Sequence, residues 1–150
     1  MKKIYPVVLA AVIASVVTAT AFADGGYGNR NSRLDPYHEL IEAGKYPQAI
    51  EKLQSALAKD ADDADLLNLL AFSQRKLGRF DEAMVNYQHA LKLEPRHRGA
   101  NEYLGELYLQ LDQPEKAEER LQVLDDACFF GCREYDKLKQ AIAEYRDSKM

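Results

Sequence analysis

The sequence has few of the residues that mark specialised protein classes. Its 150 residues include two cysteines, eight glycines, five prolines and no tryptophan. Two cysteines are too few for a small disulfide-rich scaffold, and the composition is not that of a collagen-like chain. With 47% apolar residues, the chain is also unlike a disordered acidic segment. The composition is that of one globular domain of ordinary size.

Motifs for catalysis, phosphate binding and metal binding are also absent from the sequence. It contains no G-x-S-x-G, P-loop, G-x-G-x-x-G or C-x-x-C-H sequence. His38 and Glu39 resemble the start of the zinc motif H-E-x-x-H, but Glu42 stands where the second histidine is required. We therefore expect neither an enzyme nor a bound cofactor or metal ion, and we name no catalytic residue.

The chain has no excess of positive charge. Lysine and arginine number 20 against 24 acidic residues, which gives a formal charge of −4. The one basic cluster comprises Lys92, Arg96, His97 and Arg98, and we expect it at a helix C-terminus, where cations interact favourably with the helix dipole. A nucleic-acid site requires a basic face. We therefore expect no nucleic-acid partner.

Residues 1–23 have the three-part pattern of a secretory signal peptide. Two lysines precede an apolar run of 11 residues over 7–17, and an A-x-A sequence follows at 21–23. We predict cleavage between Ala23 and Asp24, which places the protein in the periplasm or outside the cell, without membrane attachment. An uncleaved anchor is an alternative, because residues 4–23 make up a 20-residue segment, about the length that crosses a bilayer.

The body of the chain repeats itself at a spacing of 34 residues. At this shift Ala49, Ala83 and Ala117 superpose. Within each unit the apolar residues recur at helical spacing and predict two amphipathic helices. The small residues at equivalent positions allow the paired helices to approach closely, while larger residues three or four positions away fill the space between them.

Breaks separate the two predicted helices of each unit. Gly44 and Gly78 align with Asp112 in the repeat. In the second unit we expect Gly78 to stop one helix and Asp81 to be the N-cap of the next, which should end at Glu94-Pro95. Each unit is therefore predicted to be a helix–turn–helix.

These units resemble the tetratricopeptide repeat, a 34-residue motif that reads W-x2-L-G-x2-Y, then A-x3-F, then P. The resemblance implies an all-α fold, a right-handed α-α superhelix of three repeats over 35–63, 64–97 and 98–127. Asp35-Pro36 resembles an N-cap and N1 pair, so the first helix is shortened to about 36–43. The second repeat carries the pattern most completely, at Leu67, Leu70, Ala71, Ala83, Tyr87 and Pro95.

Residues 128–150 are expected to close the open end of this solenoid. Leu138, Ala141, Ile142 and Tyr145 recur at helical spacing and predict a capping helix. Residues 24–34 show no periodicity and are predicted to be disordered.

The two cysteines, Cys128 and Cys132, precede the predicted capping helix. An even cysteine count together with export predicts a disulfide, and Gly131 lets the chain turn tightly enough to form it. A C-x3-C hairpin at this place also resembles small exported tetratricopeptide proteins of Gram-negative bacteria. The alternative is a thiol–disulfide redox protein, because Cys132 would lie at a helix N-terminus beside Arg133.

The resemblance implies a protein-interaction module, because members of the family bind a peptide or a helix in a concave groove formed by the first helix of each repeat. We expect an exported scaffold or adaptor that binds an envelope partner in this groove. A membrane-anchored assembly subunit is a further alternative. By repeat position, the candidate groove residues are Ile41, Asn68, Leu69, Phe72, Arg75, Lys76, Glu102, Tyr103 and Glu106.

Overall fold

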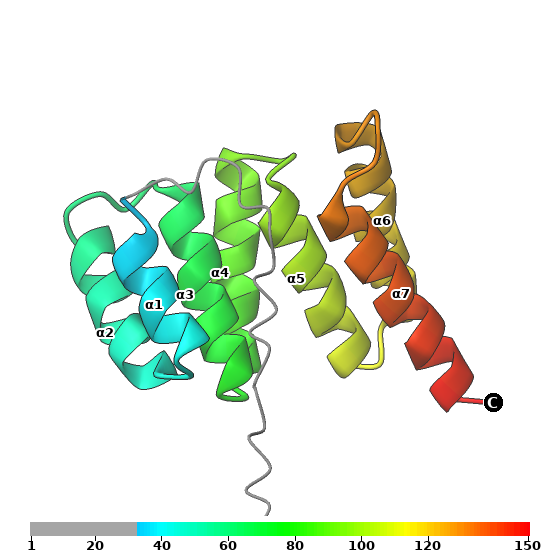
Figure 1. Cartoon of the computed structure of the whole chain (residues 1–150), viewed down its shortest axis with the longest axis horizontal. Coiled ribbons are helices and arrows are strands. Elements are labelled where there is room, and N and C mark those ends of the chain that lie inside the picture. The colour runs from blue at the N-terminus through cyan, green and yellow to red at the C-terminus, as the bar shows by residue number, and fades with distance from the viewer. Residues whose placement is uncertain (1–32) are drawn as a thin grey trace, which may run out of the picture.

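The computed structural model describes residues 33–150, which form a row of stacked helices (Figure 1). No strand occurs within this range. The predicted signal peptide and most of the segment predicted to be disordered lie outside the described residues. In chain order the helices are α1 (Asp35–Glu42), α2 (Tyr46–Leu57), α3 (Ala64–Lys76), α4 (Phe80–Leu93), α5 (Arg98–Gln110), α6 (Pro114–Ala127) and α7 (Arg133–Ser148).

Three helical hairpins follow one another along the row. α1 packs against α2, α3 against α4, and α5 against α6, while contacts between α2 and α3 and between α4 and α5 join successive hairpins. α7 packs against both α5 and α6 and closes the far end of the row (Figure 1). This arrangement confirms the predicted all-α solenoid of three helix–turn–helix repeats and one capping helix.

The turn inside each hairpin contains one residue in the left-handed backbone conformation. These residues are Gly44, Gly78 and Asp112, with φ angles of 68°, 74° and 60°. After Gly78 the Arg79 N–H donates to the Gln74 carbonyl at 2.9 Å, which satisfies a free carbonyl at the end of α3. The predicted helix stop at Gly78 is confirmed.

Two helices begin earlier than expected, α4 by two positions and α1 by one. α4 begins at Phe80, with Arg79 at the N-cap and no side-chain cap hydrogen bond, so the prediction of Asp81 as N-cap was wrong. The turn takes up only Gly78 and the N-cap Arg79, so Asp81 lies in the first turn of α4, where its negative charge interacts favourably with the helix dipole. At α1 the N-cap is Leu34, not the predicted Asp35, which is the first helical residue.

The apolar residues form three clusters that run along the solenoid. The repeated alanines Ala49, Ala83 and Ala117 lie in successive clusters, and each is completely buried. Leu57 packs against both the first and the central cluster, and Tyr108 packs against both the central and the third. The clusters therefore form one continuous apolar seam, as a repeat protein requires.

The two ends of this seam are covered by residues outside the repeats. α7 contributes Leu138 and Ile142, which are buried in the third cluster, so the predicted capping face is confirmed. Leu34 is 8% exposed and packs in the first cluster, and it therefore belongs to the folded core rather than to the segment that precedes it. Within residues 33–150, no helix combines the length and apolar character needed to cross a bilayer.

Candidate functional site

Four helices contribute to one hollow on the surface of the solenoid. They are α1, α3, α5 and α7, the first helix of each hairpin and the capping helix, which follow one another across the molecule in Figure 1. The hollow has a volume of about 240 Å³, and we call it the inner hollow. Four of the predicted groove residues line it: Asn68, Leu69, Glu102 and Tyr103.

Two predicted groove aromatics, Phe72 of α3 and Tyr103 of α5, form a pair between neighbouring repeats. Their ring centroids are 4.7 Å apart and the ring planes are tilted by 54°, an attractive geometry for aromatic rings. Tyr46 extends the group, with its ring centroid 6.5 Å from that of Phe72. The Lys76 Nζ atom lies 5.2 Å from the centroid of the Phe72 ring. All three rings are half-buried, so each keeps some accessible surface.

Arg75 is held against this aromatic pair by Glu106. The Arg75 guanidinium donates to Glu106 Oε2 at 2.7 Å, and it lies 5.5 Å from the Phe72 ring centroid and 5.8 Å from that of Tyr103. The Arg75 side chain is only 3% exposed, whereas that of Glu106 is 27% exposed. The contact therefore positions a buried cation across the junction of α3 and α5.

Asn68 and Glu102 bring two hydrogen-bond acceptors to the wall of the inner hollow. They are 6% and 3% exposed, and neither Asn68 Oδ1 nor Glu102 Oε1 has a hydrogen-bond partner. Lys137 of α7 lies nearby, with Nζ 3.7 Å from Glu102 Oε1. Burial raises the pKa of Glu102 to about 7, although the charge of Lys137 acts in the opposite direction. Glu102 therefore changes its charge near neutral pH.

The prediction from sequence missed Asp65 and His97, which also line the inner hollow. His97 is the N-cap of α5: Nδ1 accepts from the Ala100 N–H, and Nε2 lies 3.1 Å from Asp65 Oδ1. The basic cluster that contains His97 was expected at a helix C-terminus, which was wrong, because only Lys92 lies in the last turn of α4. Repeat position could have identified both residues, because each stands at the start of the first helix of its repeat.

Ile41 and Leu69 lie mainly in the core of the first repeat. Leu69 is 6% exposed and belongs to the first apolar cluster, although its edge reaches the inner hollow. Ile41 is half-buried and packs against the same cluster. The first repeat therefore contributes less to the inner face than the second and third, because its first helix has only 8 residues.

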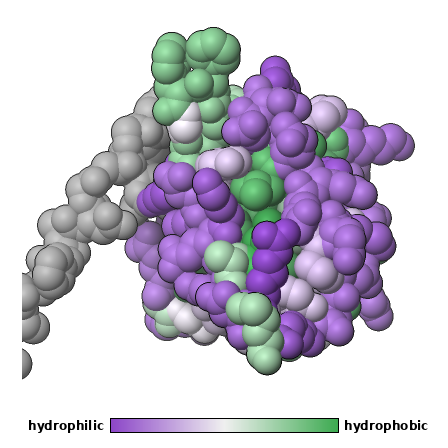
Figure 2. Space-filling view, turned by 90° about the vertical axis from the view of Figure 1, so that its right-hand side faces the viewer, coloured by the Kyte–Doolittle hydropathy of each residue, from purple (hydrophilic) through white to green (hydrophobic). Residues whose placement is uncertain are grey.

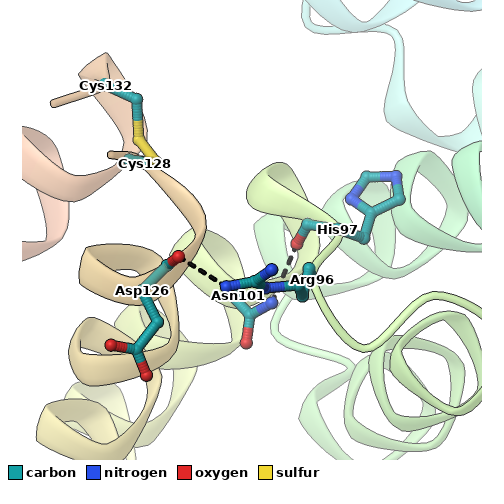
Figure 3. Close-up of a disulfide and its surroundings, with 6 residues drawn as sticks. All are labelled: Arg96, His97, Asn101, Asp126, Cys128 and Cys132. Carbon is teal, nitrogen blue, oxygen red and sulfur yellow. Dashed lines mark hydrogen bonds between the residues drawn. A yellow bond between two sulfur atoms is a disulfide. The ribbon is translucent and has the colours of Figure 1, made fainter. Parts of the chain in front are cut away.

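The predicted disulfide joins Cys128 and Cys132 in the loop between α6 and α7 (Figure 3). The two Cα atoms are 5.6 Å apart, within the usual range for a disulfide. Gly131 has a φ of 83°, the left-handed conformation that was expected to make the tight turn possible. Below the disulfide, Arg96 donates to the Asp126 carbonyl and ties this end of α6 to the loop before α5 (Figure 3).

Among residues 33–150 there is no group of three or more histidine, cysteine, aspartate or glutamate side chains that could hold a metal ion.

The tetratricopeptide repeat model matches residues 40–85 and 74–142. The rhomboid protease GluP of Bacillus subtilis is 35% identical over 72 residues, which are 48% of this chain and 14% of that protein. A repeat-containing protein of Rhizobium etli is 31% identical over 77 residues, 51% of this chain and 38% of that protein. The chain thus spans less than half of either relative.

Solved structures of low sequence identity share the fold. The type III secretion translocator chaperone SycD of Yersinia enterocolitica has a TM-score of 0.66 at 17% identity, covering 77% of this chain and 81% of that chain. PcrH in complex with the chaperone-binding region of PopD has a TM-score of 0.65 at 17% identity, covering 82% and 98%. The first repeat domain of Spaghetti (RPAP3), bound to an HSP90 peptide, has a TM-score of 0.65 at 18% identity, covering 75% and 89%. With the matches to the repeat model over residues 40–142, the chain belongs to the tetratricopeptide repeat family.

Proposed function

We propose that this protein is an interaction module that binds a peptide segment of another protein on its inner face. The observation that carries the proposal is the inner hollow, where apolar side chains and buried polar groups from four helices converge. Most of its lining is polar or charged, and Leu34, Leu69 and Tyr103 supply the apolar surface. Converging polar groups beside apolar side chains in a concave surface are a feature of ligand sites. The raised pKa of Glu102 is a further mark of such sites.

The chemistry of this face suits a mixed peptide rather than a purely apolar one. The half-buried rings of Phe72 and Tyr103 offer apolar contact, and exposed Lys76 stands beside them. Asn68 and Glu102 have acceptor atoms that no donor satisfies, whereas buried polar groups usually find partners. Rotation of either terminal torsion, which is soft, turns an acceptor toward N–H donors of a bound segment.

Peptide binding by proteins of the same fold supports this reading. SycD has been solved in complex with a peptide of the translocator YopD, with a TM-score of 0.63 and 18% identity to this chain. We propose that the partner of this chain is a protein of the same cellular compartment.

The test is recovery of partner peptides by wild type and by Phe72→Asp/Tyr103→Asp protein from an envelope extract. A segment identified by mass spectrometry is then synthesised and titrated by fluorescence anisotropy. We expect the double variant to bind it at least about tenfold more weakly, the loss typical of a central aromatic contact. Val85→Asp is the matched control, because Val85 is 64% exposed on α4, outside the inner face. Equal affinity of wild type and double variant would remove the inner face as the site.

We propose further that the chain is exported, with cleavage between Ala23 and Asp24, and that it acts in the periplasm or outside the cell. The disulfide between Cys128 and Cys132 supports export, because such bonds persist in oxidising compartments. N-terminal sequencing of the protein isolated from its native cells tests this. A start at Asp24 supports the proposal, whereas a start at Met1 in the membrane fraction favours the alternative of an anchored assembly subunit.

Thiol–disulfide chemistry is the second candidate, favoured by one observation. Cys132 occupies the N-cap of α7, where the positive end of the helix lowers the pKa of a thiol. The reduction potential of the bond decides between the candidates. A value below about −300 mV identifies a structural disulfide, and a more oxidising value indicates redox function.

A further inference from the structure

Two phenylalanines project from the loop that joins α6 and α7. Phe129 and Phe130 are 90% and 97% exposed, and their rings pack edge to face with centroids 5.0 Å apart. Figure 2, which views the molecule from the α6–α7 end, shows a hydrophobic knob that rises above a largely hydrophilic surface. We call these two residues the aromatic tip. Exposed apolar surface concentrated in this way marks an interaction site.

The loop holds the aromatic tip in a defined position. The disulfide between Cys128 and Cys132 closes the loop at its base, and the Gly131 N–H donates to the Cys128 carbonyl at 2.8 Å. A loop that is already ordered loses little conformational freedom when it binds. The ordered aromatic pair is therefore suited to insert into a partner, and the partner must offer apolar surface in a hollow.

A hollow with apolar side chains in part of its lining lies between α1 and α2. These two helices form the opposite end of the row from α6 and α7 (Figure 1). The hollow has a volume of about 620 Å³, within the range of about 300–1,000 Å³ that is usual for ligand pockets. We call it the end hollow. Its lining combines apolar and charged side chains, among them Tyr37, Leu40, Ala56, Glu51, Lys52 and Lys59.

The charges around the two surfaces are complementary. Asp125 and Asp126 are exposed in the last turn of α6, immediately before the disulfide loop, and Glu134 follows it in the first turn of α7. These three carboxylates outnumber the two cations beside the loop, Arg133 and Arg96, of which Arg96 donates to the Asp126 carbonyl. Lys52 and Lys59 are exposed beside the end hollow and outnumber its one acidic residue. The acidic surroundings of the aromatic tip also disfavour an anionic membrane as its target, because such membranes attract basic surfaces.

We propose that the aromatic tip of one copy of this chain inserts into the end hollow of a second copy. The two surfaces are different, so the contact is heterologous and joins the solenoids head to tail. Each resulting linear oligomer keeps one unoccupied aromatic tip at one end and one unoccupied end hollow at the other. Neither surface includes the aromatic pair or the acceptors of the inner face. Self-association therefore leaves the proposed peptide site open, and the two proposals can fail independently.

The first test compares wild type with Phe129→Ser/Phe130→Ser by analytical ultracentrifugation over a series of protein concentrations. We expect the average mass of wild type to rise with concentration and that of the variant to remain at one chain. The association constant should fall at least about tenfold, the loss typical of central aromatic anchors. Reduction of the disulfide should weaken wild-type association as well, because it frees the loop.

Charge reversal identifies the second surface without touching the core. Lys52→Glu/Lys59→Glu and Asp125→Lys/Asp126→Lys change only exposed side chains, so both variants should fold. Each alone should associate at least about tenfold more weakly than wild type, because like charges face one another. An equimolar mixture should associate again, because each junction in the mixture then pairs opposite charges.

A mixture of Phe129→Ser/Phe130→Ser with Lys52→Glu/Lys59→Glu should stop at a dimer, because only one productive junction is possible. The proposal is overturned if wild type stays monomeric at every concentration, or if the serine variant associates as strongly as wild type. It is overturned equally if mixing the two charge-reversed variants restores nothing. Flotation with vesicles of phosphatidylethanolamine and phosphatidylglycerol is the last measurement, and binding that depends on the aromatic tip would assign the tip to a membrane instead.

Discussion

Gly105 of α5 packs directly against Leu138 of α7, with no room for a methyl group between them. A Cβ atom at position 105 would lie 2.5 Å from Leu138 Cδ2 and 2.6 Å from its Cδ1 atom. Leu138 is itself completely buried, so its side chain has little freedom to move away. The missing side chain at position 105 therefore sets how closely the capping helix approaches the last repeat.

Gly105→Ala should destabilise the protein although alanine favours helices. Overpacking a buried contact costs about 1–3 kcal/mol, while the helix preference of alanine over glycine returns at most about 1 kcal/mol. Urea unfolding measures the difference. Gly99→Ala in the same helix is the control, because its Cβ would lie 3.1 Å from the amide nitrogen of Asn68, a side chain that can rotate. Equal stability of the two variants would contradict the close approach of α5 and α7.

Glu102 should make stability fall as the pH rises. Burial raises its pKa from 4.5 to about 7, so between these values the folded state keeps a proton that the unfolded state has released. A state that binds fewer protons gains as the pH rises, and here that is the unfolded state. The loss of folding free energy across this interval is at most about 3 kcal/mol.

Glu102→Gln removes this titration while it keeps the shape of the side chain. We expect the unfolding free energy of the variant to change less than that of wild type between about pH 5 and 8, as measured by denaturant titration at each pH. Glu119→Gln, on the exposed surface of α6, should retain the wild-type pH dependence. Parallel profiles for wild type and Glu102→Gln would rule out Glu102 as the titrating group.

Glu106→Gln should cost more stability than removal of an exposed ion pair. Glu106 is the carboxylate partner of Arg75, whose side chain is 3% exposed, and the loss of this charge should cost about 1–3 kcal/mol. The control is Glu118→Gln, whose partner Arg146 is 61% exposed, and it should change stability by less than about 1 kcal/mol. The measurement is chemical denaturation at neutral pH, and a smaller effect at Glu106 than at Glu118 would refute the claim.

Asp112 occupies the turn position that Gly44 and Gly78 fill in the earlier repeats, with a φ of 60°. Its carboxylate accepts from Tyr145 and lies 2.6 Å from Lys149 Nζ, which lowers the pKa of Asp112. Both Asp112→Gly and Asp112→Ala lose these contacts, but only alanine keeps the unfavourable backbone conformation. We expect the glycine variant to be more stable by about 1 kcal/mol in thermal unfolding. The reverse order would show that backbone strain at this position is negligible.

The helices and their order were predictable from sequence because each repeat carries its own local signals. Gly78 ends α3 and Pro95 follows the end of α4, as expected from their backbone preferences. The start of α4 was harder to place, because Asp81 has the chemistry of an N-cap while the turn at Gly78 is short enough for the helix to begin at Phe80. The N-cap expected from local composition, Asp81, and the observed N-cap, Arg79, thus differ by two positions.

The candidate site was only partly predictable. Repeat register placed Phe72, Arg75, Tyr103 and Glu106 on one face, and the structure brings these four side chains into contact. Register could not tell that Leu69 is mainly a core residue, because burial depends on how the shortened first repeat packs beside it.

The amino-acid sequence by itself determined the repeat, the helical hairpins and the final cap, because these depend on periodic apolar residues and turn residues within short stretches of chain. Tertiary structure alone decided the raised pKa of Glu102, the packing of Leu138 against Gly105 and the exposure of Phe129 and Phe130. Those properties depend on which distant surfaces remove water from a side chain and which leave it in solvent. Local pattern carries no information on that distinction.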